Sequence, residues 1–388
     1  MQHYHSWMKE TPEFRLLLLL THPSPDRQYN AIEKFLSENK INWNEFLKNI
    51  KWHRITPQSY DSLKSHTELV PESIIKKLRQ SCMECKKTSI LQAALLLKIA
   101  RIFKEHKIKL IAIKGVALSQ LLYSDFTMRE AHDIDIIVDF NQVEYAEEVL
   151  ISGLGFTRII PDISATSKQV KYLNSRLKDR VYQHETDKTI LELHWRFNNI
   201  KQVLKIPFQL MYETSSCISL HAENINFLSE EDLWLYQCLH GSMSSWYRLH
   251  WISDIARMLF IMQPDWNMLL DKSDKYHCRR NLVEAVMLAS VLYKLPVPEQ
   301  IEQVFHCDKK QQLQLKWAKK SLQAGCIHSM MSGFRRHLFF SPTRFFLSYF
   351  IDNLRITPTD FKLFPLPDRF FFLYFWLRPI FRIIRIFK

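Results

Sequence analysis

The pattern of hydrophobic and polar positions divides the chain into a helical beginning, a strand-rich middle and a second helical part. Apolar residues recur with helical spacing between Trp43 and Ile50, which predicts one apolar helix face. A broad apolar stripe from Leu91 to Ile102 predicts a longer helix over residues 81–106. Residues 1–106 are therefore expected to form an N-terminal helical region.

Residues 107–200 switch to patterns that are typical of strands. The segment KIKLIAI at 107–113 and the β-branched run at 132–139 predict two strands, with a short helix over 116–123 between them. Asn141 is expected to cap a helix that runs through Leu150. Three further strand patterns follow, at 156–160, 181–184 and 189–197. This part of the chain predicts a small α/β core.

From about residue 200 to Val304 the pattern is helical, and residues 311–323 predict another helix. Ser229, followed by acidic residues in the next turn, is typical of a helix N-cap. The expected fold class is therefore α+β, with a small mixed-sheet core between extensive N- and C-terminal helical regions. We predict four parts: 1–106, 107–200, 201–330 and 331–388.

Composition narrows the possible classes of protein. The chain has 388 residues, of which 47% are hydrophobic and 24% charged, which excludes wholesale disorder, collagen and a multi-span membrane protein. It has only six glycines and contains neither GxxxxGK[ST] nor GxGxxG, so nucleotide chemistry would need another device. Seven cysteines without framework spacing favour a reducing cytosol, and Cys82 and Cys85 fit an ordinary helix face better than a zinc site.

Positive charge is concentrated at the C-terminus. The chain carries a formal net charge of +13, and residues 331–388 hold ten basic against three acidic residues and 14 of the 26 phenylalanines. Residues 368–388 are expected to form an amphipathic helix after Pro367, with Asp368 as its N-cap and Pro379 as a kink or a second start. Two interpretations remain open: peripheral contact with an anionic membrane, or docking on the protein's own core. Nucleic-acid binding is disfavoured, because no recognition module is visible.

Candidate chemistry is concentrated around two aspartates of one predicted strand. Asp133 and Asp135 are two residues apart, so both side chains leave the same face of the strand. Neighbouring carboxylates repel unless a cation neutralises them, and oxygen-only ligands suit Mg²⁺ or Mn²⁺. Glu192, a charged residue in a strand-like apolar run, is the best candidate for a third acid, with Asp187 and Glu185 as alternatives.

The same region offers groups that could bind phosphate. Lys114 and Gly115 lie at a strand-to-helix turn, where backbone N–H groups can face an anion. Arg129 could add a phosphate contact, or could pair with Glu130 or Asp125. Asp139 shares the parity of the two aspartates but is expected to end the strand. His194 and Trp195 are expected to be packing residues.

These residues carry a resemblance to a known family. The ordered motifs are KGVALSQLLY, a following Arg, DIDIIV, LELHW, then LHGSMSSWYRLHWISDIA at 239–256, with NWNEFL and HRITP near the N-terminus. The set resembles the bacterial uncharacterised nucleotidyltransferase family of the DNA polymerase β-like superfamily. The resemblance implies a short mixed sheet with helical extensions. It implies that Asp133 and Asp135 bind metal, that Glu192 is the third acid, and that nucleotide binds near Lys114 and Gly115.

The function that we expect is Mg²⁺- or Mn²⁺-dependent transfer of a nucleoside monophosphate from a nucleoside triphosphate to a hydroxyl acceptor, with release of pyrophosphate. The resemblance adds surface-polysaccharide or modified-peptide biosynthesis as the setting. The expected location is cytoplasmic, with possible peripheral contact at the inner face of the membrane. The alternatives are a non-catalytic nucleotide-binding scaffold and a membrane-surface adaptor that works through its basic tail. Some residues of the later helical part could line the acceptor side or simply hold helices together: His240, Trp246, Arg248, Asp254 and Arg257.

Overall fold

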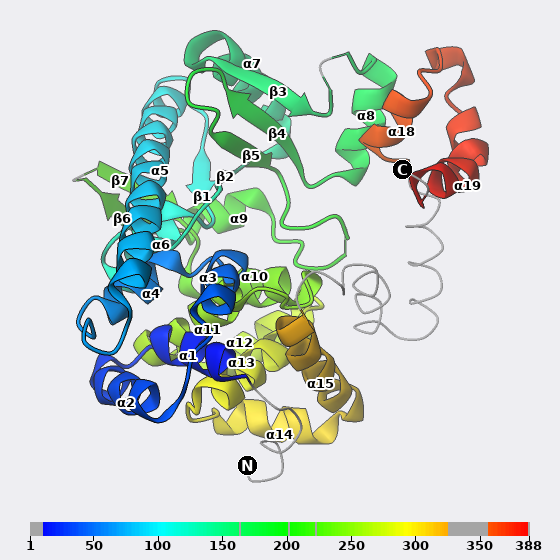
Figure 1. Cartoon of the computed structure of the whole chain (residues 1–388). Coiled ribbons are helices and arrows are strands. Elements are labelled where there is room, and N and C mark those ends of the chain that lie inside the picture. The colour runs from blue at the N-terminus through cyan, green and yellow to red at the C-terminus, as the bar shows by residue number, and fades with distance from the viewer. Residues whose placement is uncertain (1–10, 163, 201, 222, 325–355, 387–388) are drawn as a thin grey trace.

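The structure is a computed structural model that describes residues 11–386 except 163, 201, 222 and 325–355 (Figure 1). In the described part of the chain, one mixed seven-stranded sheet is surrounded by helices that precede and follow it in sequence. This arrangement confirms the expected α+β class. A continuous hydrophobic core runs from Phe14 to Leu322. It joins three of the four predicted parts of the chain, and the division into four parts stays a prediction.

The sheet has the strand order β3-β4-β5-β2-β1-β7-β6. Strand β2 is central, pairing parallel to β5 and antiparallel to β1, while β1 pairs parallel to β7. All of β2 after Asp133 is buried, in keeping with its β-branched sequence. The strands are β1 (Leu110–Ala112), β2 (Asp133–Val138), β3 (Phe156–Ile160), β4 (Asp179–His184), β5 (Ile190–His194), β6 (Ser216–Leu220) and β7 (Glu223–Phe227).

The expectation of helices alone after residue 200 is wrong. Strands β6 and β7 form an antiparallel hairpin at the edge of the sheet. Ile218 and Leu220 on β6, and Ile225 and Phe227 on β7, are buried, and the residues between them are more exposed. This period of two is visible in the sequence, but each strand has only five residues and lies between longer helical patterns.

Among the described residues, five helices precede the sheet, and the last of them is the longest. Helix α5 begins after Pro71, earlier than expected, and runs along one face of the sheet in contact with β2 and β7 (Figure 1). Its buried residues form the broad stripe that the sequence indicates. The helices are α1 (Pro12–Leu20), α2 (Pro25–Glu38), α3 (Trp43–His53), α4 (Thr56–Leu63) and α5 (Glu72–Glu105).

Two helices connect strands beside the centre of the sheet. Helix α6 (Val116–Tyr123) follows β1, as expected. After β2, the cap expected at Asn141 is instead Asp139, whose carboxylate accepts the N–H of Asn141 at 2.8 Å. It begins a short 3-10 turn, η2 (Phe140–Gln142), that leads into α7 (Val143–Leu154). Asp139 therefore ends the strand, as the sequence predicts.

The helices after the sheet pack around α13 (Arg279–Tyr293), which contacts α10, α11, α12, α14 and α15. Ser229 caps α10 by accepting the N–H of Asp232, which confirms the expected N-cap. The other helices that follow β3 are α8 (Ser167–Arg176), α9 (Phe208–Glu213), α10 (Glu230–Met243), α11 (Leu249–Ile261), α12 (Trp266–Lys275), α14 (Glu299–Cys307) and α15 (Lys309–Ala324).

The C-terminal segment folds back against α8 (Figure 1). It contains α18 (Pro358–Leu363), the 3-10 turn η5 (Asp368–Phe370) and α19 (Leu373–Ile386). Asp368 is the first residue of η5 and accepts the Thr166 hydroxyl at 2.5 Å, so it is not the expected N-cap. Helix α19 continues through Pro379, and the side chains of Arg382 and Arg385 lie outside the described ones.

A separate apolar cluster fixes this C-terminal segment, with Leu173 of α8 packed against Phe361, Phe371, Tyr374 and Phe381. The expected amphipathic helix thus does dock on the protein with one face. Among the described helices, none is long and apolar enough to cross a membrane.

Candidate active site

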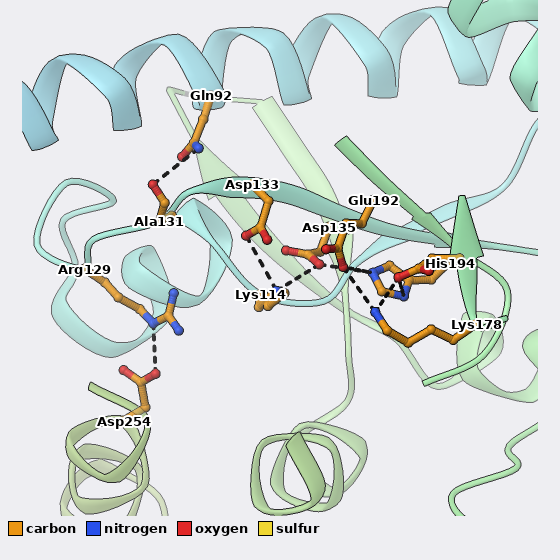
Figure 2. Close-up of polar contacts among 11 residues, drawn as sticks. Gln92, Lys114, Arg129, Ala131, Asp133, Asp135, Lys178, Glu192, His194 and Asp254 are labelled. Carbon is orange, nitrogen blue, oxygen red and sulfur yellow. Dashed lines mark hydrogen bonds and ion pairs between the residues drawn. The ribbon is translucent and has the colours of Figure 1, made fainter. Parts of the chain in front are cut away.

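The acidic residues predicted from the sequence meet on two neighbouring strands. In the parallel pair of β2 and β5, Asp135 lies opposite Glu192. Because residues two apart share a face, Asp133 and Asp135 of β2 lie on the same side of the sheet as Glu192 and His194 of β5 (Figure 2). The register therefore brings together all three acids that were predicted to bind metal.

Lys114 lies among these carboxylates. It follows β1, and its ammonium is 3.0 Å from Asp135 Oδ1 and 3.6 Å from Asp133 Oδ1. Burial alone lowers the pKa of Lys114, but the adjacent carboxylates of Asp135 and Asp133 outweigh it and hold that pKa well above its usual value. A positive charge thus occupies the position between the two aspartates where a cation is expected.

His194 is a site residue that the sequence reasoning assigned to packing. Its Nε2 lies 3.0 Å from Asp135 Oδ1 and 3.2 Å from Glu192 Oε2, and its side chain is only 1% exposed. The available signal was its parity, because a residue two places after Glu192 on a strand shares the face of Glu192. An imidazole is therefore part of the cluster.

A second lysine neutralises the outer side of the cluster. Lys178 Nζ lies 3.2 Å from Glu192 Oε2 and also pairs with Asp179, the first residue of β4. Asp179 Oδ2 is in turn 3.7 Å from Nδ1 of His194. Three basic groups thus stand among four carboxylates, within side chains that are mostly buried.

These contacts shift the pKa values of the Asp135 and Glu192 carboxyl groups in opposite directions. Burial and the charge of Asp133 raise the pKa of the Asp135 carboxyl to about 6. Burial also raises the pKa of Glu192, but the hydrogen bond and charge of His194 outweigh it and hold that pKa well below its usual value. Glu192 is therefore ionised at neutral pH, while Asp135 stays ionised only because cations surround it.

The geometry of the site includes an oxygen that suits a metal ion. Oδ2 of Asp135 is buried and has no hydrogen-bond partner among the described residues. A buried carboxylate oxygen without a donor is costly, and a cation would satisfy it. Asp135, Glu192 and His194 each present a ligand atom, all within 4.8 Å of one another. The residues present therefore fit a divalent cation.

Gly115 forms the turn between Lys114 and α6. Its φ of +69° and ψ of −136° are accessible to glycine at little cost, and a Cβ there would lie 3.4 Å from the backbone oxygen of Asp133. Its conformation supports the predicted role of Gly115 and does not test it.

Arg129 has a partner that the sequence did not indicate. It lies just before β2 and is 4% exposed, and its Nε donates to Asp254 Oδ2 on α11 at 2.9 Å (Figure 2). The pairing is thus neither with Glu130 nor with Asp125, because α11 packs against α6 and brings Asp254 close. A phosphate contact from Arg129 stays a prediction.

The two alternative third acids lie in the turn between β4 and β5. Asp187 accepts the N–H of Thr189 at 2.9 Å and lies 3.0 Å from Nδ1 of His184. Glu185 accepts the Thr157 hydroxyl at 3.0 Å. Both carboxylates thus have partners within or beside their own turn, and Glu192 is the acid that lies at the cluster.

Most of the later candidates make contacts that hold helices together. Arg257 of α11 donates to the Leu122 oxygen at 2.9 Å, and Arg248 lies over the Trp52 and Tyr247 rings. His240 of α10 packs between aromatic rings, and burial with the charge of Lys114 lowers its pKa well below the usual value. The His240 imidazole is therefore neutral.

Comparison with known proteins identifies the family. A family model described as uncharacterised nucleotidyltransferase matches residues 39–294, about two thirds of the chain. The chain belongs to this uncharacterised nucleotidyltransferase family. The resemblance noted from the sequence motifs is confirmed, and the match includes every residue of the acidic cluster. Membership of a nucleotidyltransferase family supports nucleotidyl transfer as the general class of reaction.

Other comparisons add little to the nucleotidyltransferase assignment. No curated protein matches the chain. Among solved structures, the chain is similar to an antigenic nucleotidyltransferase-like protein from Paracoccidioides brasiliensis, with 17% identity and a TM-score of 0.35, over 55% of this chain and 96% of that one. This likeness is too low to support a functional conclusion.

Proposed function

We propose that this chain transfers a nucleoside monophosphate from a nucleoside triphosphate to a hydroxyl acceptor. The observation that carries the proposal is the parallel register of β2 and β5, which sets Asp135 opposite Glu192 with Asp133 on the same face. The acceptor oxygen would bond to the α-phosphorus as the bond from that phosphorus to the bridging oxygen breaks. Pyrophosphate leaves, and the hydroxyl proton goes to a site carboxylate.

Asp133, Asp135 and Glu192 would hold Mg²⁺ or Mn²⁺. When bound, the cation supplies charge neutralisation at the triphosphate and activation of the acceptor hydroxyl. Lys114 would then be released from the aspartates toward the triphosphate, and the α6 N-terminus at Gly115 would donate N–H groups to it. The acceptor class that we propose is a saccharide, a lipid-linked sugar or a peptide.

A thermal-shift panel tests the proposed site. We would combine ATP, GTP, CTP or UTP with Mg²⁺ or Mn²⁺, using the wild type and the double variant Asp133→Asn/Asp135→Asn. A ligand at about 100 times its Kd stabilises by about 2.7 kcal/mol, so a metal-dependent increase in Tm is expected in the wild type alone. Asp139→Asn is the matched control. Asp139 ends β2 outside the cluster, and asparagine at this position keeps an oxygen that can accept the N–H of Asn141.

A nucleotide-dependent shift that survives in the double variant would refute the assignment of the aspartates. Catalysis is tested separately, by release of pyrophosphate from the nucleotide that shifts Tm when sugar, lipid-linked and peptide hydroxyls are offered. Binding without pyrophosphate release from any acceptor would favour the non-catalytic scaffold instead.

We also propose that α19 contacts an anionic membrane, which would place the chain at the inner face of a cytoplasmic membrane. The observation that favours this contact is a pair of exposed apolar side chains: Trp376 of α19 is 80% exposed, and Phe372, just before this helix, is 56% exposed. Arg378 is turned inward, bonded to Asp360 at 2.8 Å, and the exposed side chains described between residues 370 and 380 are all apolar, within a segment of net positive charge. Such a combination is typical of an interfacial helix.

Vesicle flotation tests this contact with the full chain. Neutral phosphatidylcholine vesicles are compared with vesicles that contain phosphatidylserine, and we expect flotation with the anionic set. Phe372→Ser/Trp376→Ser should abolish it, whereas Met83→Ser, which removes a 63% exposed side chain from α5, should not. Equal flotation of the wild type and Phe372→Ser/Trp376→Ser would show that another surface contacts the membrane, and flotation of none of the three proteins would exclude membrane contact; either result would overturn the role of α19.

A further inference from the structure

The imidazole of His194 lies close enough to Asp135 and Glu192 to bind the same cation. Its Nε2 points at Asp135 Oδ1 and Glu192 Oε2, at 3.0 and 3.2 Å. All three side chains come from the central strands β2 and β5, which are rigidly paired over five successive positions (Figure 2). Such short contacts between a ring nitrogen and two carboxylate oxygens require a positive charge between them, as a proton or as a metal ion.

The far side of the ring is arranged as it is in metal-binding histidines. A ligating histidine generally directs its other ring nitrogen to a carboxylate, which fixes the ring orientation. Here Nδ1 of His194 is buried without a hydrogen bond among the described residues, and the nearest carboxylate, Oδ2 of Asp179, lies 3.7 Å away. A proton on Nδ1 directed at Asp179 would leave the Nε2 lone pair facing Asp135 and Glu192.

A second, independent observation points to a cation at this cluster. Oδ2 of Asp135 is buried without a hydrogen-bond partner among the described residues, in a side chain that is 0% exposed. Lys114 reaches only the other oxygen, Oδ1. The cluster therefore has one unused oxygen on its most buried acid, beside the imidazole.

We infer that Asp135, Glu192 and His194 form a mixed imidazole–carboxylate site that selects Mn²⁺ over Mg²⁺. Nitrogen ligands favour first-row transition ions, whereas Mg²⁺ prefers oxygen ligands and keeps its water. Asp133, the most exposed of the three acids on this face, then remains to contact a second ion or the nucleotide. The inference rests on the proposed function and adds to it the identity of one ligand and of the preferred cation.

Mn²⁺ itself is the probe, added to the full chain without nucleotide. Electron paramagnetic resonance of free Mn²⁺ gives the Kd, and pulsed measurements on bound Mn²⁺ detect coupling to a directly bound imidazole nitrogen. We expect one such coupling in the wild type and its replacement by a ¹⁵N coupling when histidine is labelled. In His194→Gln the coupling should vanish, and Mn²⁺ affinity should fall at least tenfold.

Competition with Mg²⁺ measures the selectivity for Mn²⁺. His194→Gln should weaken the binding of Mg²⁺ by less than about threefold, because the oxygen ligands of Mg²⁺ remain. His132→Gln is the control, because this histidine precedes Asp133 but is 51% exposed and pairs with Glu130. If His194→Gln does not fold, Asp179→Asn keeps the ring and removes its orienting partner, and a fall of about tenfold or more in Mn²⁺ affinity is expected.

Mn²⁺ that binds without nitrogen coupling, or a coupling that persists in His194→Gln, would overturn the inference. The proposed nucleotidyl transfer would stand in that case if Mg²⁺ and nucleotide still shift Tm together. Absence of any cation binding, with or without nucleotide, would overturn both. The two failures are therefore distinguishable.

Discussion

Single basic residues neutralise the carboxylates of the cluster on β2 and β5. Lys114 takes the place of a cation, with its ammonium 3.0 Å from Asp135 and a side chain that is only 13% exposed. Removing one partner of a buried ion pair leaves an uncompensated charge, which typically costs about 3–5 kcal/mol. The lysine is thus a stabilising group of the cluster as well as a candidate phosphate ligand.

Lys114→Met should therefore lower the free energy of unfolding by about 3 kcal/mol in the presence of a chelator. Saturating Mn²⁺ should recover most of this loss, because a bound cation replaces the missing charge. Urea unfolding with and without Mn²⁺ measures both values. Lys109→Met, at an exposed lysine just before β1, should change neither. A loss of equal size in chelator and in Mn²⁺ would contradict this role for Lys114.

His53 should make the free energy of unfolding depend on pH. Nδ1 of His53, at the end of α3, accepts the N–H of Leu249 at 3.1 Å, so the folded state requires its neutral ring. Burial lowers the pKa of His53 from 6.5 to about 4. As the pH falls, His53 takes up a proton in the unfolded chain before it does so in the folded protein. The free energy of unfolding therefore decreases as the pH falls from about 6.5 toward about 4.

The contribution of His53 to the free energy of unfolding should thus be about 2 kcal/mol smaller at pH 5 than at pH 7. Urea unfolding of the wild type and of His53→Gln at both pH values isolates it, because other buried histidines cancel in the difference. The variant should lose less stability than the wild type between pH 7 and pH 5. Parallel losses would show that His53 is already charged in the folded protein.

At the scale of elements, α10 packs closely against the loop that follows it. A Cβ on Gly241 would lie 1.9 Å from the Trp246 ring, which is fully buried. The chain reverses there through two residues with positive φ, Ser245 and Trp246. The indole therefore occupies the space that a side chain at 241 would need.

Gly241→Ala should destabilise the protein by about 1–3 kcal/mol, as overpacking does in dense cores. Gly153→Ala is the matched comparison, because a Cβ at this position of α7 meets nothing within 4 Å. That substitution should stabilise the protein by about 0.5–1 kcal/mol through helix propensity. Thermal unfolding of the two variants gives the comparison, and a stable Gly241→Ala would show that Trp246 can move.

Elements also show what could be predicted from the sequence. The period of two in β2 fixes the shared face of Asp133 and Asp135, and the apolar run around Glu192 identifies β5. Pairing between distant strands is not visible in any local pattern, so the register that sets Asp135 opposite Glu192 could only be expected from the family resemblance. His194 was missed because a histidine in an apolar strand is more often a packing residue than a ligand.

The whole molecule is held together across its two halves by contacts that local patterns cannot indicate. Arg129 precedes β2, whereas Asp254 lies on α11, 125 residues further along the chain. Their side chains are 5% and 0% exposed. Burial raises the pKa of Asp254 against the lowering effect of Arg129, so the arginine charge keeps this acid ionised. The pair thus joins the segment before β2 to the later helices at a buried position.

Arg129→Met should lower the free energy of unfolding by about 3–5 kcal/mol, because it leaves the Asp254 carboxylate buried and unpaired. Arg129→Met/Asp254→Leu should recover most of that loss, since two apolar side chains leave no buried charge. The double-mutant cycle, measured by urea unfolding, gives the coupling energy between the two residues.

The control for this cycle is a pair that also joins distant elements but lies in solvent. Arg101 of α5 is 2.7 Å from Glu223 of β7, with side chains 62% and 44% exposed, so Arg101→Met should cost less than about 1 kcal/mol. A double variant no more stable than Arg129→Met would mean that the loss comes from packing and not from the unpaired charge. A recovered double variant would make this ion pair a specific connection between the sheet and α11, on which the position of the helical side of the site depends.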